Sequence, residues 1–246
     1  MSFSKQIILT SSLFILSMLL FEWTSLDLWI QQYFFNSEQQ QWLWDKSEPI
    51  AQFVFYDGIK ALLIVFAFFL IICLTCLRHT HWVKEHSYGM RIVLISLILV
   101  PLTISTLKAT TNVACPHDLH IFGGQIPYIK VLESYPDNER PLKQQRCFPA
   151  GHASGGFALL SLMFLFQRRP NRQGALIFAL CLGWLMGGYK MVIGDHFFSH
   201  TLITMEISWL LICFVVLVDQ KVQAINANLS KNVIKNLSLQ PGESPP

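Results

Sequence analysis

The chain has 246 residues, of which 52% are hydrophobic and only 13% are charged, and its formal net charge at pH 7 is +3. Its apolar residues stand in continuous runs and not at the spacing of amphipathic soluble helices, which excludes an ordinary soluble domain. The sequence therefore predicts an integral membrane protein, and we expect no nucleic-acid partner.

Six apolar runs are long enough, or nearly so, to cross a bilayer, which takes about 20 residues. They are Ile7–Trp23, Phe53–Leu77, Ile92–Leu107, Ala153–Phe166, Ala175–Ile193 and Phe197–Val218. The third and fourth runs are short, so we expect their ends to enter protein. The first run could be a signal peptide, but no small-x-small cleavage site follows it, and Trp23 is typical of an interface anchor, which favours an uncleaved helix. The predicted fold is an all-α membrane protein with six transmembrane helices in one bundle.

Basic residues set the expected orientation. They gather between runs two and three, between runs four and five, and after run six: Arg78, Lys84 and Arg91; Arg168, Arg169 and Arg172; Lys221, Lys231 and Lys235. The positive-inside rule places these segments and both termini in the cytoplasm. The second outer loop, Lys108–Pro149, departs from the rule because it carries Lys130, Arg140, Lys143 and Arg146. An error in the topology is one explanation; we prefer the alternative that some of these cations bind an anion.

The domain prediction is simple. Residues 1–225 are expected to form the six-helix transmembrane domain, and residues 226–246 a disordered cytoplasmic tail. Cys115 and Cys147 flank the second outer loop, which should face an oxidising compartment. A disulfide between them would tie the ends of that loop together, and two free thiols are the alternative.

Ionisable residues gather at the outer ends of the apolar runs. One segment is Cys147-Phe148-Pro149-Ala150-Gly151-His152, a second is Gly194-Asp195-His196-Phe197-Phe198-Ser199-His200, and Lys108 ends run three. Such groups are costly at membrane depth and usually mark a site. Each histidine alone could be an interfacial residue hydrated by water, but the set favours a site that binds an anion and transfers a proton.

These residue types suit the cleavage of a phosphate ester. That reaction needs cations and N–H groups around the phosphoryl oxygens, a nucleophile, and an acid for the leaving oxygen. Lys108, Arg146 and the Gly151 amide could bind phosphate, aided by the positive end of a helix that begins near Gly151. His196 could be the nucleophile, and His200, four residues on, could orient it from the same helical face.

Three segments also match known motif frames. Lys108, six residues and Cys115-Pro116 correspond to Lys, six residues, Arg-Pro; Pro149-Ala150-Gly151-His152 corresponds to Pro-Ser-Gly-His; Tyr189-Lys190, five residues, His196, three residues and His200 correspond to Ser-Arg, five residues, His, three residues, Asp. The region from Lys108 to Thr201 therefore resembles the type 2 phosphatidic acid phosphatase superfamily, membrane lipid phosphatases related to bacterial acid phosphatases and vanadium haloperoxidases. The resemblance implies an outward-facing site in a six-helix bundle.

The same resemblance assigns roles. His196 would form a covalent phosphohistidine, and His152 would protonate the leaving group. Lys108, Lys190 and the Gly151 amide would bind phosphate. No cofactor is implied.

Several motif residues are substituted. Cys115 stands where the family has arginine, so Arg146 or Lys143 could replace that cation, and Ala150 removes a serine hydroxyl. Lys190 is a point charge in place of a planar arginine fork. His200 replaces the aspartate that fixes the nucleophile's tautomer, and Asp195 or Glu206 could supply the missing acid. These changes predict a divergent member with altered substrate or weakened catalysis.

The expected function is a metal-independent phosphatase that removes phosphate from a lipid phosphomonoester or diphosphate. A lipid phosphotransferase with the same intermediate and a non-catalytic lipid-binding or transport relative are the alternatives. A zinc site at His152, His196 and His200 is disfavoured by the neighbouring cations. The expected partners are a lipid phosphate and membrane lipids, the expected location is a bacterial inner membrane with the site facing the periplasm, and the oligomeric state and the particular lipid are left open.

Overall fold

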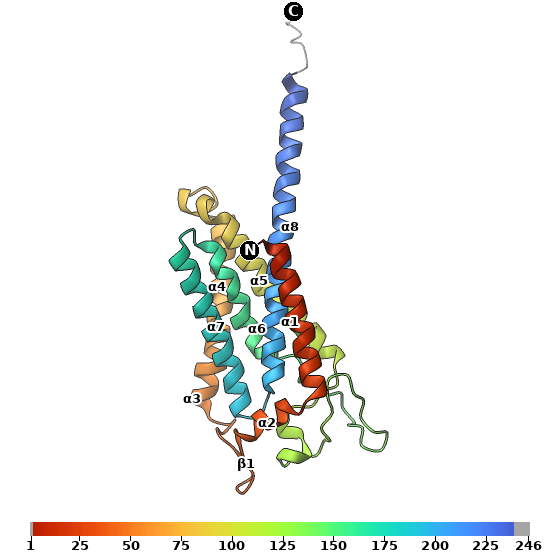
Figure 1. Ribbon diagram of the computed structural model, residues 1–246. Coiled ribbons are helices and arrows are strands. Elements are labelled where there is room, and N and C mark those ends of the chain that lie inside the picture. Colours follow the sequence, from red (N-terminus) through yellow and green to blue (C-terminus); the bar gives the residue numbers. More distant parts are fainter. Residues whose placement is uncertain (1, 239–246) are drawn as a thin grey trace, which may run out of the picture.

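The computed structural model describes residues 2–238, and it is built mainly of helices (Figure 1). The long helices are α1 (Phe3–Trp23), α4 (Gly58–Thr75), α5 (His81–Thr110), α7 (Arg169–Val192) and α8 (Phe198–Ser238). The shorter α6 (Gly151–Ala158) continues as the 3-10 helix η4 (Leu159–Leu165). The connections carry α2 (Leu26–Gln32), α3 (Pro49–Gln52), the π-helical turn η1 (Phe53–Asp57), and the 3-10 turns η2 (Pro116–Asp118) and η3 (His120–Phe122). An antiparallel hairpin of β1 (Phe35–Asn36) and β2 (Gln41–Trp42) pairs Phe35 with Trp42.

Five helical segments in the described part of the chain are long and apolar enough to cross a membrane: Phe3–Trp23, Pro49–Thr75, His81–Thr110, Arg169–Val192 and Phe198–Ser230. The helical class expected from the sequence is therefore confirmed. The expected fourth span is instead the shorter apolar stretch Gly151–Leu165. Its α-helical and 3-10 parts rise about 12 Å and about 14 Å, which together fall short of a hydrocarbon core of about 30 Å.

The short α6 is enclosed by other helices. It packs against α5, α7 and α8, and Phe157, Leu160 and Ile212 are buried in the shared core. A Cβ on Gly156 would lie 2.7 Å from the Cα of Gly183, so α6 and α7 touch backbone to backbone. Small residues permit this close approach between membrane helices. Protein therefore surrounds a helix that is too short to meet both headgroup layers.

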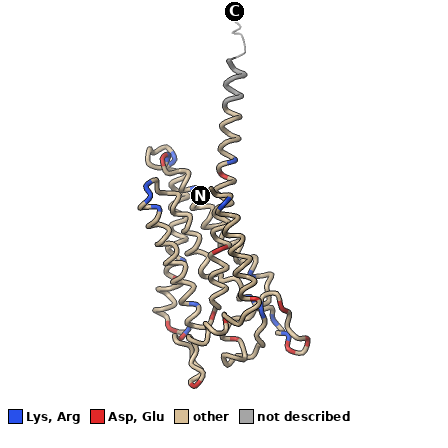
Figure 2. The backbone as a smooth tube through the Cα atoms, in the orientation of Figure 1, with Lys and Arg blue, Asp and Glu red and all other residues tan. Residues whose placement is uncertain are grey.

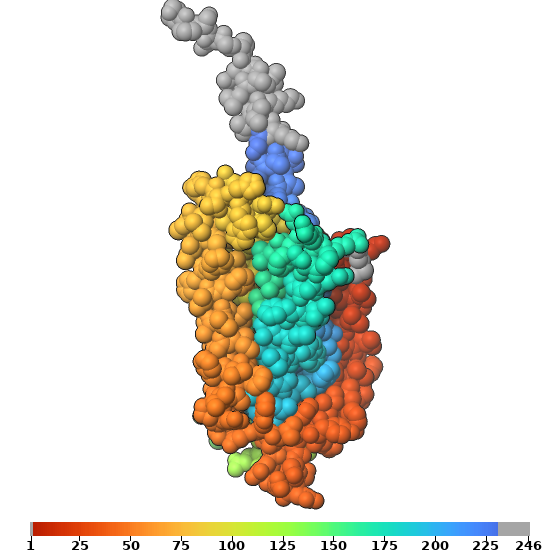
Figure 3. All heavy atoms as spheres, turned by 90° about the vertical axis from the view of Figure 1, so that its left-hand side faces the viewer, coloured from red at the N-terminus to blue at the C-terminus, as the bar shows by residue number. Residues whose placement is uncertain are grey.

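The two ends of the bundle differ. Both termini lie at one end, and α2, the hairpin and the long connection between α5 and α6 lie at the other (Figure 1). Basic residues occur at both ends (Figure 2), as the unusual charge of the second outer loop anticipated. Figure 3 shows the segment from α2 to α3 running across the base of α7 and α8. The side of the membrane that each end occupies stays a prediction.

The C-terminal region differs from the expectation of disorder. α8 continues beyond the bundle as a projecting helix to Ser238, and only residues 239–246 of the expected tail lie outside the described residues. Alanine, leucine, lysine and glutamine between residues 219 and 231 are good helix formers. Val222, Ile225 and Leu229 also follow helical spacing, although all three are exposed on the projecting segment.

Candidate active site

The connection between α7 and α8 turns at a glycine that no other residue could replace without strain. Gly194 has φ +76°, and a Cβ there would lie 2.4 Å from the indole of Trp42. After the turn, the N–H groups of Asp195 and His196 donate to the carbonyl of Lys190 at 2.8 and 3.1 Å. The turn therefore directs Asp195 and His196 back over the end of α7.

His196 lies in this connection and not in α8, which begins at Phe198. The expectation that His196 and His200 share one helical face is therefore wrong, because only His200 belongs to the helix. The two rings are nevertheless neighbours, with centroids 5.7 Å apart. His196 is 1% exposed, and so is His200.

The segment before α6 is held by α8. The N–H of Ala150 donates to the carbonyl of His200 at 3.1 Å, and the hydroxyl of Thr204 donates to the carbonyl of Ala150 at 3.2 Å. Ala150 caps α6, so Gly151 and His152 form its first turn. The N–H groups of a first turn have no partner within the helix, and they carry its positive dipole end.

These two anchored segments bring His152 and His196 together. Nδ1 of His152 lies 3.2 Å from Nε2 of His196, so one nitrogen donates a proton and the other accepts it. Burial, followed by the neighbouring histidines and lysines, holds the pKa of His196 well below its ordinary value. A neutral His196 with its proton on Nδ1 has a lone pair on Nε2, which is the form that a nucleophile requires.

The other side of His196 faces a disulfide. Cys115 and Cys147 are bonded, with an S–S distance of 2.09 Å, and the sulfur of Cys147 lies 3.4 Å from Nδ1 of His196. The bond that the sequence left open is therefore present, and it touches the site directly. Cys147, His196 and His200 have potential metal-ligand atoms within 4.8 Å of one another. In the oxidised protein, however, Cys147 cannot supply a thiolate, which is the sulfur ligand that zinc takes.

His200 is packed between aromatic rings. Phe148 and Phe197 meet it edge to face at 5.2 and 5.4 Å. Nδ1 of His200 is buried without a hydrogen-bond partner among the described residues. The proposed orienting contact with His196 is therefore not made as a hydrogen bond in this arrangement, and the role of His200 stays a prediction.

Asp195 pairs with two lysines, and Nδ1 of His117 also lies 3.4 Å from its Oδ1. Its carboxylate lies 2.8 Å from the amine of Lys190 and 2.7 Å from the amine of Lys46. Burial opposes ionisation of Asp195, but the hydrogen bonds and charges of the two lysines outweigh it and hold its pKa below the usual range. Glu206, the other candidate acid, accepts a hydrogen bond from Ser17 at 2.8 Å. Neither carboxylate contacts Nδ1 of His196.

The expected phosphate-binding residues divide into two groups. Lys108 lies beside the start of α6, where a Cβ on Gly151 would be 4.0 Å from its amine. Lys190 is near the histidines but already paired with Asp195. Arg146 and Lys143 are exposed, and neither forms an ion pair within residues 2–238. Neither of these two cations lines the cleft beside His152, and their binding of phosphate stays a prediction.

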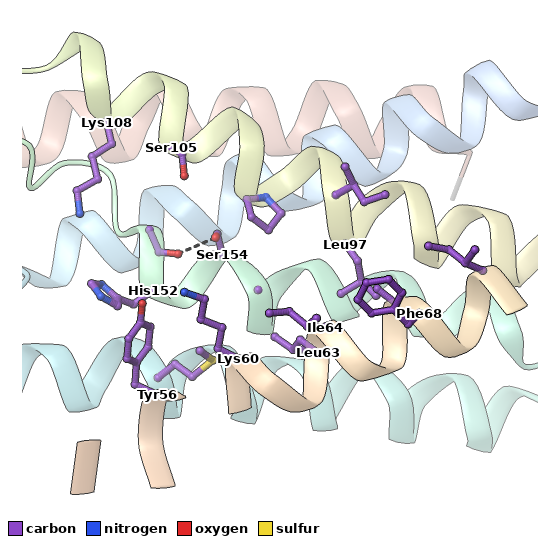
Figure 4. Close-up of a pocket in the computed structure, with 17 residues that line it drawn as sticks. Tyr56, Lys60, Leu63, Ile64, Phe68, Leu97, Ser105, Lys108, His152 and Ser154 are labelled. Carbon is purple, nitrogen blue, oxygen red and sulfur yellow. Dashed lines mark hydrogen bonds between the residues drawn. The ribbon is translucent and has the colours of Figure 1, made fainter. Parts of the chain in front are cut away.

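A cleft of about 580 Å³ leads away from His152 between α4 and α5 (Figure 4). One end is polar and is lined by Tyr56, Lys60, Lys108 and His152. The other end is apolar and is lined by Leu63, Ile64, Phe68, Leu97, Ile98 and their neighbours. Its wall residues Phe68 and Ile98 are 61% and 56% exposed, so the cleft opens at the side of the bundle.

Residues 89–224, more than half of the chain, match the family model of the PAP2 superfamily. The chain belongs to the PAP2 superfamily. No curated protein and no solved structure matches it. Membership indicates phosphatase-type chemistry, and the matched region contains Lys108, the disulfide, Lys190 and the three histidines discussed above.

Two further residues near the PAP2 site, Tyr56 and Lys60, lie before the matched region and belong to none of the three motifs. Tyr56 meets the His152 ring edge to face at 4.6 Å, and the amine of Lys190 lies 5.2 Å from the Tyr56 ring centroid. The spacing of Asp57 and Lys60 suits either a structural ion pair or a second layer around a phosphate site. Asp57, however, accepts a hydrogen bond from Gln52 at 3.2 Å. The sequence feature that could have indicated the place of Tyr56 and Lys60 in the site is a tyrosine and a lysine, four residues apart, near the end of an apolar run.

Proposed function

We propose that this PAP2 protein hydrolyses a phosphorylated membrane lipid through a phosphohistidine on His196, without a metal ion. The observation that carries the proposal is the 3.2 Å contact between His152 and His196 at the head of a lateral apolar cleft. A nucleophile and a proton donor are adjacent there, and Lys108 with the first turn of α6 provides positive charge beside them.

In the proposed reaction, Nε2 of His196 attacks phosphorus. The P–O bond to the leaving group breaks, its electron pair stays on that oxygen, and the oxygen takes a proton from His152. Water then attacks the phosphohistidine, the N–P bond breaks, and the proton of the water passes to His152. Because the two ring nitrogens lie at hydrogen-bond distance, substrate must part them when its phosphoryl group enters.

The cleft supports a lipid as the substrate. Beyond Lys60 the residues that line the cleft are apolar. The cleft opens at the side of the bundle, between helices that are apolar enough to span a membrane. A hydrocarbon chain could lie in it while the phosphate reaches His152. A small water-soluble phosphate would leave this surface unused.

The disulfide and the charge distribution support an outward-facing site. Disulfides persist in oxidising compartments, and Cys115–Cys147 lies at the same end of the bundle as the histidines. Basic residues at the opposite end fit the positive-inside rule. These features support our proposal of a bacterial inner membrane with the site on the periplasmic side.

The test is phosphate release by the purified protein from a panel of lipid monophosphates and diphosphates, with and without a chelator. We expect release that ignores the chelator and that is abolished in His196→Ala and in His152→Ala. His86→Ala is the matched control, because His86 lies near the beginning of α5, at the opposite end from the site. Full activity of His196→Ala would exclude the assignment. Phosphate retained on His196 without release would instead favour a phosphotransferase that lacks its acceptor.

A further inference from the structure

Lys60 occupies a distinct position in the cleft. It lies in the first turn of α4, lines the cleft, and its amine is 5.8 Å from the centroid of the Tyr56 ring. In Figure 4 the Lys60 side chain points into the cleft, and its amine lies between His152 and the apolar side chains Leu63 and Ile64. Lys108 reaches the same polar end from the opposite wall, on α5.

The order of residues along α4 gives the depth of Lys60. Tyr56 contacts the His152 ring, Lys60 follows four residues later, and Leu63 and Ile64 come one turn after that. Four residues of helix rise about 6 Å. The amine of Lys60 is therefore on the side of His152 toward which a lipid chain would extend.

Among the described residues, no acid pairs with Lys60. None of the ion pairs in the described part of the chain includes it, and the nearest acid in sequence, Asp57, is hydrogen-bonded to Gln52. Lys190, by contrast, is neutralised by Asp195. An unpaired cation beside apolar helix surface is costly unless its amine reaches water or an anion. Lys60 is exposed and its side chain points into the cleft, so its amine is accessible to an anionic group of a ligand there.

We propose that Lys60 binds a second phosphate, the one that remains with the lipid, and that the substrate is a lipid diphosphate. The inference rests on the proposed function. When His196 attacks the terminal phosphorus, the bond from that phosphorus to the bridging oxygen breaks. The bridging oxygen keeps the electron pair and takes the proton of His152. The leaving group is then a lipid monophosphate, whose negative charge lies on the side of His152 where Lys60 stands.

A lipid monophosphate does not need a second cation for its leaving group. Its leaving group is an alcohol, which becomes neutral once His152 has protonated it. Lys60 would then face no second charge, and Lys108 with the α6 N-terminus would suffice for the single phosphate. The position of Lys60 therefore separates the two substrate classes.

The experiment compares an isoprenyl diphosphate with the isoprenyl monophosphate of the same chain length, using the full chain in mixed micelles. We expect Lys60→Met to lower kcat/KM for the diphosphate about tenfold or more, and for the monophosphate less than about twofold, since a charge-assisted contact is lost only with the former. Lys60→Arg should retain most of the diphosphate activity. Lys84→Met, at an exposed lysine near the beginning of α5, is the control and should change neither value.

Equal losses on both substrates, or no loss on either, would overturn the role of Lys60 while leaving the phosphatase intact. Hydrolysis of the monophosphate alone by the wild-type protein would have the same meaning. Hydrolysis of neither lipid would overturn the inference, and the proposed function would fall with it if no lipid of the panel above released phosphate.

Discussion

The amine of Lys190 lies 2.8 Å from the carboxylate of Asp195, so the lysine expected to bind phosphate is already paired with an acid. The Lys190 side chain is 9% exposed and that of Asp195 is 10% exposed. A phosphate that reaches Lys190 must therefore share the lysine with Asp195 or displace the carboxylate. The Lys190–Asp195 pair therefore links the stability of the folded protein to its affinity for anions at Lys190.

Asp195→Asn should destabilise the protein and make it more responsive to phosphate. Removal of one partner leaves a buried charge unpaired, which costs about 3–5 kcal/mol when no water reaches it. An anion that replaces the carboxylate should restore part of that loss. Thermal unfolding with and without millimolar inorganic phosphate measures both effects, and the rise in Tm should be larger in the variant than in the wild type.

The matched control is Asp219→Asn. Asp219 pairs with Arg91 at 3.2 Å, and its side chain is 12% exposed, but the pair belongs to the opposite end of the bundle. This variant should lose stability without gaining any extra response to phosphate. An identical response in the two variants would show that phosphate does not act at Lys190.

Asp27 should make folding stability depend on pH in a defined window. The Asp27 side chain is buried. Its carboxylate accepts hydrogen bonds from the N–H of Ser199, at 2.9 Å, and from the Ser199 hydroxyl. Burial raises the pKa of Asp27 to about 6, and the hydrogen bonds from Ser199 oppose that rise only in part. The folded protein then binds the proton more tightly than the unfolded chain, so stability falls as pH rises from about 4 to about 6.

Asp27→Asn removes this titration. The difference in unfolding free energy between wild type and variant should change by up to about 3 kcal/mol across that window and stay constant above it. Thermal unfolding at half-unit pH steps gives the two curves. Parallel curves from pH 4 to pH 7 would contradict the raised pKa.

Loss of the Cys115–Cys147 bond should affect both stability and turnover. The bond closes a segment with a sequence separation of 32, for which its removal costs about 3–4 kcal/mol. The sulfur of Cys147 also contacts the His196 ring, so the ring should lose its support on that side. Tm and phosphate release measured with and without a thiol reductant test this, and a Cys115→Ala/Cys147→Ala variant should be insensitive to the reductant. A Cys181→Ser variant should behave as the wild type, because Cys181 is a free cysteine.

His200→Asp should retain or raise turnover, whereas His200→Ala should lower it about tenfold or more if His200 positions the nucleophile. A carboxylate can accept the Nδ1 proton of His196 and keep the lone pair on Nε2. It should also move the acidic limb of the kcat–pH profile to higher pH, because it stabilises the protonated ring. A profile that is unchanged in both variants would leave His200 as a packing residue only.

The sequence predicted the parts of the site that depend on backbone position. Continuous apolar runs marked the spans, and motif spacing predicted that His152 and His196, 44 positions apart, would meet. The fourth run could not be distinguished from a full span, because its enclosure by α5, α7 and α8 depends on helix packing. The prediction that His196 and His200 share one helical face was wrong, because the turn at Gly194 delays the start of α8 to Phe198.

The partners of charged side chains were less predictable. Asp57 and Lys60 have the spacing of a helical ion pair, yet the π-helical turn η1 ends at Asp57 and Lys60 faces the cleft. Asp195 pairs with Lys46, which lies in a segment with no motif. Such contacts join distant parts of the chain, and a single sequence carries no pattern for them.

The contacts that Asp27 and Lys46 make with the connection between α7 and α8 and the start of α8 also bear on the order of folding. Asp27 and Ser199 are 172 positions apart, and Lys46 and Asp195 are 149 apart. At ordinary rates of synthesis, Asp27 and Lys46 wait roughly 10–30 s for these partners to emerge from the ribosome. A chain that stalls within α7 would already hold α1, α4 and α5 in the membrane, but the carboxylate of Asp27 and the amine of Lys46 would still lack their partners. The contacts around the histidines therefore form late in synthesis.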